Sequence, residues 1–273
     1  MDREQARVRC PVRDSRVTVL GGPGGAAAPA ATERVYQDDA YLSTLEAPLT
    51  RIEGERGLVF ERTNFFAAGG GQPGDSGFVE TADGRQIKIV DTVYAPDKAT
   101  VVMLAEEGSA LPAAGETLVL HVDWKRRYKL MRMHTACHLL TVVCPFPITG
   151  AAVGEEESRI DFDIPDASAD KAGVTAQLMD LVAANHSVFT RWITEAELDA
   201  NPGLVKSANV KPPRGSGRIR LVCIGENGSV DTQPCGGTHV QETGEVGDIH
   251  IGKIEKKGKS NRRFRIRFGP LPG

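Results

Sequence analysis

The spacing of apolar residues predicts short β-strands in the first half of the chain. From residue 32 to about residue 120, apolar stretches are brief and are separated by turn-forming pairs such as Glu-Gly, Asp-Gly and Gly-Glu. Short strands that recur roughly every eight to twelve residues are typical of small antiparallel β-barrels. The predicted strands are 44–52, 57–62, 77–81, 86–93, 99–105 and 117–122.

The period of the apolar pattern becomes helical after Trp124. Apolar side chains then recur at helical spacing, and Pro145 ends the pattern because proline cannot continue a helix. The positions that share this helix face are Leu130, Met133, Cys137, Leu140 and Cys144. A second helix is predicted at 168–187, with Ser168 as its N-cap.

A third helix and further strands complete the predicted second half. The helix begins at Thr194, because Thr194 and Glu197 have the spacing of a capping box. The strands are predicted at 158–164, 188–193, 217–224, 248–256 and 262–268, and a hairpin loop joins the last two. Helices mixed with antiparallel strands place this half, and the chain as a whole, in the α+β class.

These patterns divide the chain into three parts. Residues 1–31 hold several arginines and then a run of glycine, proline and alanine, which predicts a disordered N-terminal extension. Residues 32–122 form the predicted β-barrel domain. Residues 123–273 form the predicted α+β domain.

The composition is that of an ordinary globular protein. The chain has 273 residues, of which 40% are hydrophobic and 25% are charged, so collagen-like, wholly disordered and coiled-coil classes are excluded. No apolar run reaches the roughly 18 residues that a membrane-spanning helix needs. Five cysteines at scattered positions make no paired disulfide framework, which favours a reducing, cytoplasmic location.

Two histidines on the first predicted helix indicate a metal site. His134 and His138 are one helical turn apart, so both project from one face, at the edge of the apolar stripe. We expect the pair to face a cleft. Two histidines with this spacing chelate a transition metal well, but taken alone the pair is more simply explained as surface or packing residues.

A second pair of ligands shifts this balance toward a metal. Cys235 and His239 lie in the segment Cys-Gly-Gly-Thr-His, on a glycine-containing turn after Pro234. Together with the helical pair they supply the nitrogen and sulfur ligands that zinc prefers. Because the pairs are far apart in the chain, a site assembled across the fold is favoured over a local zinc finger.

The order of these motifs resembles the editing domain of alanyl-tRNA synthetase and its free-standing AlaX-type relatives. The resemblance rests on the two ligand pairs, on a glycine-rich segment of the GGGQ type at 69–77, on Arg-Ile-Asp-Phe-Asp at 159–163 and on the basic stretch 253–259. It covers about residues 32–268. The relatives it indicates are of the medium length that includes the barrel.

This resemblance implies one Zn²⁺ per chain, held by His134, His138, Cys235 and His239. It also implies hydrolysis of the ester that joins serine, or glycine, to tRNA(Ala). Zinc can lower the pKa of a water molecule and act as a Lewis acid, but four protein ligands are typical of a structural site. Two roles therefore stay open: the coordination expands when substrate binds, or zinc orients the substrate while another group activates water.

The residues that would contact the substrate are less clearly marked. The family commonly has Gln or Thr on the strand after the first helix, but 149–154 contains no Gln, which leaves Thr135 and Thr149 as candidates for the serine hydroxyl. Either threonine has an ordinary structural explanation. The resemblance places the glycine-rich segment near the editing cleft, although a sharp barrel turn explains it too. Its candidate residues are Gly69, Gly70, Gly71, Gln72 and Asp75.

Basic residues are unevenly distributed in a chain whose net charge is −3. Lys and Arg gather at 125–132, 206–220 and 253–267, all within the part that holds the ligand pairs. A basic patch in an acidic protein favours a polyanionic partner, here tRNA, although any single cluster is also explained as a solvated face. The candidate phosphate contacts at the last hairpin are Lys256, Lys257 and Lys259.

Three classes of function are compatible with these observations. The leading one is a zinc-dependent aminoacyl-tRNA deacylase. The second is a tRNA-binding module of the same fold without catalysis, and the third is a metal-stabilised interaction domain that has no role with RNA. The intact ligand pairs favour the first over the second, and the basic segments count against the third.

Overall fold

The computed structural model describes residues 31–164, 170–209, 211–212 and 214–272. The chain divides after Ala30, and the residues from Ala31 onward form one compact unit. The predicted disordered extension lies outside the described residues except for Ala31.

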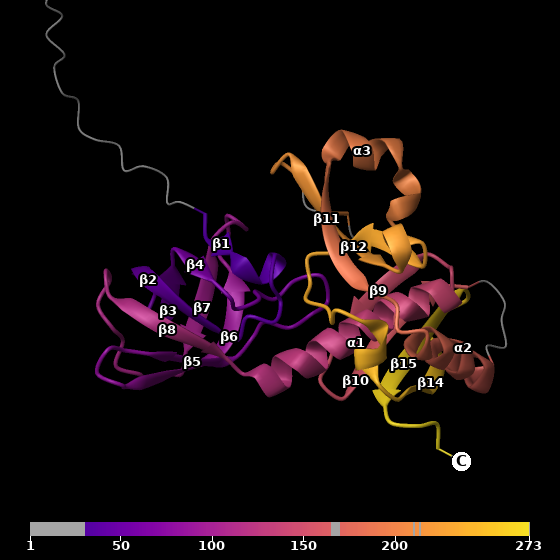
Figure 1. Ribbon diagram of the computed structural model, residues 1–273, viewed down its shortest axis with the longest axis horizontal. Helices are drawn as coiled ribbons and strands as arrows, with labels where there is room; N and C mark the ends of the chain where they lie inside the picture. The colour runs from indigo at the N-terminus through magenta and orange to yellow at the C-terminus, as the bar shows by residue number, and fades with distance from the viewer. Residues whose placement is uncertain (1–30, 165–169, 210, 213, 273) are drawn as a thin grey trace, which may run out of the picture. The chain divides into compact units, whose positions relative to one another are not determined.

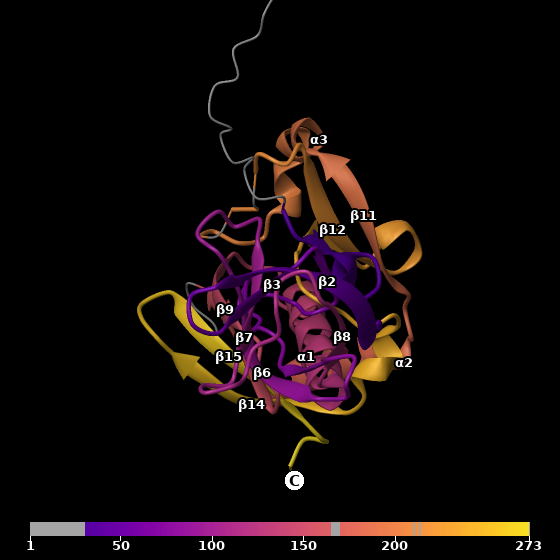
Figure 2. The same cartoon turned by 90° about the vertical axis from the view of Figure 1, so that its left-hand side faces the viewer.

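Six strands of the first part close into the predicted antiparallel barrel (Figures 1 and 2). Their order around the barrel is β2 (Thr44–Glu53), β3 (Gly57–Phe60), β7 (Val101–Ala105), β6 (Gln86–Tyr94), β5 (Gly77–Glu80) and β8 (Thr117–Val122). Side chains alternate between buried and exposed along β2 and β8, which is the pattern of strands with one face in the core. Leu49, Phe60, Ile89 and Leu120 fill the barrel interior.

The predicted strand at 57–62 is divided in the structure. Its first part is β3, and Arg62 and Thr63 form β4, which pairs in parallel with β1 (Glu33–Arg34). A short 3-10 helix, Val35–Gln37, follows β1.

The described residues of the second part form two antiparallel sheets and three α-helices, so the α+β class is confirmed. The four-stranded sheet has the order β14 (Ile249–Lys256), β15 (Asn261–Phe268), β10 (Glu157–Asp163) and β9 (Ile148–Ala152). The three-stranded sheet has the order β11 (Val188–Thr194), β12 (Arg218–Ile224) and β13 (Asp231–Pro234). The helices are α1 (Trp124–Val143), α2 (Lys171–Ala183) and α3 (Glu195–Ala200).

A second core lies between the four-stranded sheet and the helices α1 and α2. Leu140 of α1 and Leu178 of α2 belong to the same buried cluster as Phe162 and Phe264 of the sheet. The rings of Phe162 and Phe264 meet edge to face with their centroids 5.5 Å apart. Three more short 3-10 helices connect the strands, at Pro202–Leu204, Glu226–Gly228 and Thr243–Val246.

The start of α1 agrees with the predicted change of period at Trp124, whereas the bounds of α2 differ from the predicted 168–187. Helix α1 begins at Trp124, because the side chain of Asp123 caps the backbone N–H of Arg126 at 3.1 Å. Helix α2 begins at Lys171 with Asp170 as its N-cap, whereas the predicted cap Ser168 lies outside the described residues. The capping box that starts α3 is confirmed.

Strands β9 and β13 were not predicted from the apolar pattern. Strand β9 consists of Ile, Thr, Gly and Ala, and β13 reads Asp-Thr-Gln-Pro, so neither shows the alternation of a half-buried strand. Pairing with better-defined neighbours, β10 and β12, holds them in place.

A buried ion pair joins α1 to the glycine-rich segment of the barrel. Arg127 lies in the first half of α1 and its side chain is fully buried. Its Nε donates to both oxygens of Asp75 at 3.0 and 2.9 Å, and its Nη2 donates to the carbonyl of Asn64 at 2.7 Å. Asp75 also accepts the backbone N–H of Phe66 at 2.6 Å. The pair therefore fixes where the glycine-rich segment lies against the helix.

We predict that Arg127→Met lowers the free energy of unfolding by about 3–5 kcal/mol, because it leaves the Asp75 carboxylate buried without its cation. Urea unfolding followed by circular dichroism measures this loss. Lys129→Met is the matched control on the same helix, since Lys129 pairs with the exposed Glu156 and an exposed pair contributes at most about 1 kcal/mol. Equal losses of stability in the two variants would contradict the claim that Arg127 holds the glycine-rich segment against α1.

Candidate metal centre

The two helical histidines lie on the inner face of α1. His134 and His138 are 6% and 5% exposed, and their ring centroids are 5.4 Å apart. They are therefore buried and do not face an open cleft, because the loop that follows β13 covers them.

That loop brings the other pair of predicted ligands to the helix. The Sγ of Cys235 lies 3.5 Å from the Nε2 of His134 and 3.4 Å from the Nε2 of His239. The ligand atoms of His134, His138, Cys235 and His239 all lie within 4.8 Å of one another. Three imidazole nitrogens and one thiolate that converge in this way could hold a metal ion, and this donor set is one that zinc prefers.

The loop approaches the helix closely enough that one position has no room for a side chain. A Cβ placed on Gly237 would lie 2.2 Å from the Cε1 of His134 and 2.8 Å from the Oε1 of Gln72. Glycine at this position therefore lets the loop close over the histidine.

The charges around the cluster favour the forms of the side chains that bind metals. Burial raises the pKa of the Cys235 thiol, but the neighbouring imidazole of His134 outweighs it and brings the pKa well below its usual value. Burial, together with the neighbouring His134, lowers the pKa of His239 well below its usual value, so this imidazole is neutral. Thiolate and neutral imidazole are the forms that act as ligands.

His138 differs because a carboxylate faces it. Burial alone would lower its pKa, but the hydrogen bond from its Nδ1 to Asp231 raises the pKa to about 9. Binding of a metal at Nε2 therefore requires this histidine to lose a proton.

Each histidine of the cluster has its Nδ1 held by a different partner. The Nδ1 of His134 is 2.7 Å from the Oε1 of Gln72, which also accepts the backbone N–H of Thr238. The Nδ1 of His138 is 3.0 Å from Asp231, and the Nδ1 of His239 is 3.1 Å from the hydroxyl of Thr135. Partners at Nδ1 fix the ring orientation and leave Nε2 directed at the centre.

Asp231 is the buried end of a wider polar network. Burial raises its pKa, but His138 and Lys206 bring the pKa down to about 2, so it is a carboxylate. Lys206 contacts its Oδ1 at 2.5 Å, and Gln233 donates to its Oδ2 at 2.7 Å. Sequence reasoning missed Asp231 and Gln233, for which the one available signal is a pair of polar residues just before Cys235.

Arg220 holds the other end of the ligand loop. Its side chain is buried, and its Nη1 donates to the carbonyls of Cys235 and Gly237, each at 2.9 Å. Its Nε donates to the carbonyl of Gln37 at 3.2 Å, which links the loop to the segment that leads into the barrel.

Comparison with known proteins places this centre in a family. A family model described as the threonyl and alanyl tRNA synthetase second additional domain matches residues 219–265, which include Cys235 and His239. The chain is 32% identical to the alanyl-tRNA editing protein AlaX-M of Methanosarcina mazei over 244 residues, which cover 85% of this chain and 95% of the relative. The chain belongs to the AlaX-M family.

Other relatives agree with this assignment. The AlaX-M protein of Saccharolobus solfataricus is 28% identical over 88% of the chain and 100% of the relative. The alanine–tRNA ligase of Pyrobaculum aerophilum is 34% identical over 87% of the chain, but the chain spans only 27% of that longer protein.

The glycine-rich segment of this AlaX-M member lies beside the candidate metal centre. Gln72 and Asp75 are buried, and they contact His134 and Arg127, respectively. Gly70 and Gly71 have φ values of 59° and 86°, and a Cβ on Gly71 would lie 2.9 Å from the carbonyl oxygen of Ala151. The segment thus reaches from the barrel to both α1 and β9.

The two threonines proposed for the serine hydroxyl have different surroundings. Thr135 is fully buried, and its hydroxyl meets His239 at 3.1 Å and the backbone N–H of Val240 at 3.4 Å. Thr149 lies on β9, donates to the carbonyl of Asp161 at 3.1 Å and accepts from Asn261 at 2.8 Å. Only Thr135 touches a residue of the cluster.

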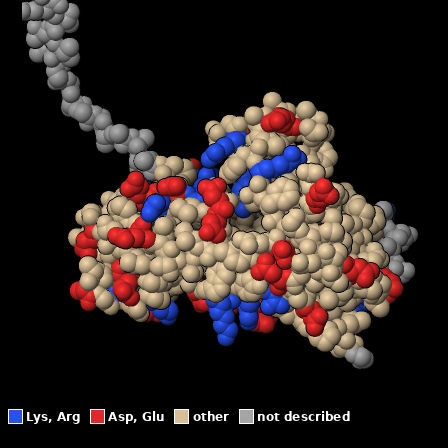
Figure 3. Space-filling model, in the orientation of Figure 1, with Lys and Arg blue, Asp and Glu red and all other residues tan. Residues whose placement is uncertain are grey.

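Much of the positive charge of the predicted basic segments is neutralised within the molecule. Arg263 pairs with Asp161 at 2.7 Å, Arg265 pairs with Glu157, and Lys257 pairs with Glu255 at 3.0 Å. The hairpin residues Lys256 and Lys259 are exposed. In Figure 3, Lys and Arg gather beside β11 and β12 and along the lower edge of the molecule.

Among the described residues, no helix has the length and apolar character needed to cross a membrane.

We predict that Asp231→Asn weakens binding of a transition-metal ion by about 10–100-fold, because the amide holds the ring of His138 less firmly than the carboxylate does. Competition with a chromophoric chelator measures the affinity. Lys206→Met is the matched control, since it removes the partner of the other carboxylate oxygen and leaves the contact with His138 in place. The same loss in both variants would mean that the network acts on stability and not on the ligand.

Proposed function

We propose that this AlaX-M member hydrolyses the ester of tRNA(Ala) mischarged with serine, and secondarily with glycine, in trans. The observation that carries the proposal is the convergence of three histidines and one cysteine, each histidine held at Nδ1, in a chain that belongs to a family of alanyl-tRNA editing proteins. A binding module without catalysis is not favoured, because it has no need for four converging ligands.

The metal proposed for the centre is one Zn²⁺ per chain, held by His134, His138, Cys235 and His239. Its donor set fits zinc because it combines imidazole nitrogen with thiolate sulfur. When bound, zinc supplies Lewis acidity and lowers the pKa of a coordinated water. The other steps fall to groups of the chain, which orient the ligands and select the aminoacyl group.

Among those groups, Thr135 is the better candidate to recognise the serine hydroxyl. A threonine hydroxyl offers one donor and two acceptor positions. With Nε2 of His239 directed at the metal, its Nδ1–H donates to Thr135, and so does the N–H of Val240. Within the described part of the chain, the hydroxyl of Thr135 then has no acceptor for its own hydrogen, whereas Thr149 already donates to Asp161. A buried donor that lacks a partner favours binding of the seryl group, whose hydroxyl can accept its hydrogen, and disfavours the alanyl group, which has no hydroxyl.

We predict that the purified protein deacylates Ser-tRNA(Ala) fastest, Gly-tRNA(Ala) more slowly and Ala-tRNA(Ala) least. The double variant Cys235→Ala, His239→Ala should lose its zinc and should lose deacylation by roughly two orders of magnitude or more. Release of labelled amino acid and metal analysis of the same samples measure the two effects.

His186→Ala serves as the control for this experiment, because His186 lies outside the ligand cluster and its backbone, which the substitution keeps, hydrogen-bonds to Thr243. Full zinc occupancy in the double variant would refute the ligand set. Tight binding of tRNA without release of any amino acid would favour the binding module.

We also propose that tRNA approaches over the basic segments 125–132, 206–220 and 253–267, with Lys256, Lys257 and Lys259 at the last hairpin. This is supported by the exposure of the three hairpin lysines. Lys257 and Lys253 both pair with Glu255, so this single carboxylate faces two cations. Lys and Arg contacts to phosphates release counterions, so affinity that depends on them falls steeply with salt.

We predict that changing the three hairpin lysines to Glu weakens tRNA binding and flattens its salt dependence without altering zinc content. Filter binding across a salt series measures both. A triple change of exposed barrel residues, Arg85, Lys88 and Lys98 to Glu, adds the same negative charge elsewhere. If the barrel triple and the hairpin triple weaken binding equally, net charge and not the hairpin sets the affinity.

A further inference from the structure

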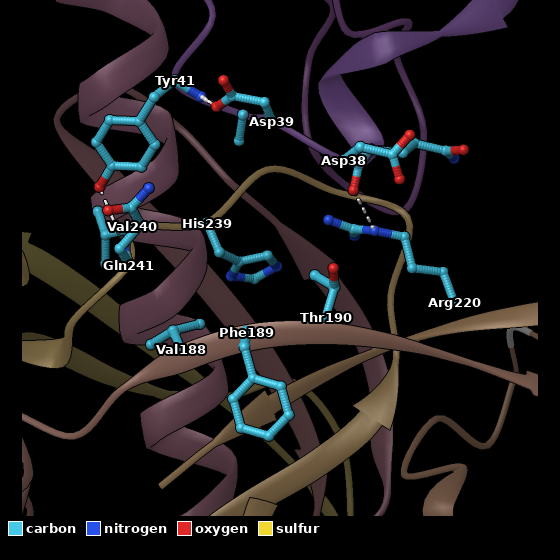
Figure 4. A pocket seen from close by; sticks show the side chains of 12 residues that line it. Asp38, Asp39, Tyr41, Val188, Phe189, Thr190, Arg220, His239, Val240 and Gln241 are labelled. Carbon is cyan, nitrogen blue, oxygen red and sulfur yellow. Dashed lines mark hydrogen bonds between the residues drawn. The ribbon is translucent and has the colours of Figure 1, made fainter.

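A cavity of about 320 Å³ opens beside the metal centre. Its walls come from the segment 37–41, from the start of β11 at 188–190, from Arg220 and from 239–241 (Figure 4). His239 belongs both to this wall and to the ligand cluster. A group bound in the cavity therefore lies next to the proposed site of ester hydrolysis.

The β11 side of the cavity is the open edge of a sheet. Among the strands that the structure describes, β12 is the one that pairs with β11. The backbone N–H of Val188 points away from β12, because it donates to the carbonyl of Gln241 at 2.7 Å, whereas the carbonyl of Ser187 accepts from Gly225 on the β12 side. Since backbone groups alternate along a strand, the N–H and C=O of Thr190 also point away from β12.

The neighbouring chain covers this edge only as far as the cavity. Ser187 forms a bridge with Glu242, and Val188 bonds to Gln241, after which the covering chain leads back to His239. Within the part of the chain that the structure describes, no group hydrogen-bonds to the backbone N–H or C=O of Thr190. A donor and an acceptor thus stand side by side on the cavity wall.

The charges around the cavity suit an uncharged ligand better than a phosphate. The exposed carboxylates of Asp38 and Asp39 line it and would repel an anion. The guanidinium of Arg220 already donates to the carbonyls of Gln37, Cys235 and Gly237. Figure 4 shows the side chain of Thr190 on the same side of β11 as His239, and the ring of Phe189 on the opposite side.

We propose that this cavity binds the terminal adenine of the aminoacyl-tRNA, with the N–H of Thr190 donating to N1 and its C=O accepting from the N6 amino group. Adenine carries this acceptor and this donor side by side on one edge, so the edge is complementary to the N–H and C=O of Thr190. The base then occupies the cavity, and the ribose that bears the ester extends past His239 toward the ligand cluster. This inference rests on the proposed deacylase function, because that function supplies the adenosine.

Replacing the terminal adenosine of Ser-tRNA(Ala) by inosine tests the proposal without changing the protein. Inosine has a donor at N1 and an acceptor at position 6, so both proposed hydrogen bonds are inverted. We expect kcat/KM to fall roughly 10–100-fold, which corresponds to two lost hydrogen bonds and an N–H facing another donor. Equal kcat/KM for the two substrates would overturn the assignment.

The variant Thr190→Pro removes the N–H of Thr190 and leaves its carbonyl. The change is compatible with the strand, because this N–H lies on the free edge, where proline is tolerated. We expect the preference for adenosine over inosine to shrink to roughly 3–10-fold in this variant, because the N–H that opposes inosine is gone while the carbonyl still favours the N6 amino group of adenine. Thr190→Val keeps the N–H and should keep the full preference of the unchanged protein.

Binding measurements separate failure of this inference from failure of the proposed function. Equilibrium binding of uncharged RNA hairpins that end in adenosine or inosine requires no catalysis. If no aminoacyl-tRNA is hydrolysed but the adenosine-ended hairpin binds at least tenfold more tightly, the cavity assignment stands and the deacylase proposal fails. If both hairpins bind equally while Thr190→Pro alters self-association in gel filtration, the open edge pairs with a second copy and the assignment is overturned. If Thr190→Pro does not fold, the comparison of the two RNA ends on the unchanged protein still decides.

Discussion

The candidate metal centre depends on the orientation of three imidazole rings, each of which must present Nε2 to one point. A histidine ring is free to rotate and to change tautomer unless Nδ1 is held. Here the three partners come from three different parts of the chain: Gln72 from the barrel segment, Thr135 from α1 and Asp231 from β13. The cluster can form only when these parts are placed together, so its geometry depends on the assembly of the whole fold.

The buried side chains of two arginines hold these parts of the chain together. Arg127 ties α1 to Asp75, three residues after Gln72, and so brings the barrel segment to His134. Arg220 ties β12 to the carbonyls of Cys235 and Gly237 and so shapes the ligand loop. Both arginines are buried, where loss of a charged hydrogen-bond partner costs far more than at the surface. The absence of a side chain at Gly237 completes the closure over the helix.

The sequence indicates the four ligands but only some of the residues that hold them in place. His134 and His138 show helical spacing, Cys235 and His239 share one short turn, and turn-forming pairs separate the short apolar stretches of the barrel, so these features were predicted and the structure contains them. Asp231 and Arg220 carry no spacing signal, because each acts through a contact that forms only after β12 and β13 pair. The open strand edge at Thr190 could not be predicted from the sequence either, because it depends on where the chain before Glu242 turns away from β11. Local periodicity thus identifies elements and ligands, whereas tertiary contacts decide what holds them.

X-ray absorption spectroscopy at the zinc edge of the full chain tests the central claim most directly, because it reports the atoms that surround the metal. The account predicts one sulfur at about 2.3 Å and three nitrogen ligands at about 2.0–2.1 Å. It also predicts that the sulfur signal disappears in Cys235→Ser. A zinc environment made of oxygen and nitrogen alone in the unchanged protein, or a sulfur signal that survives this substitution, would contradict it.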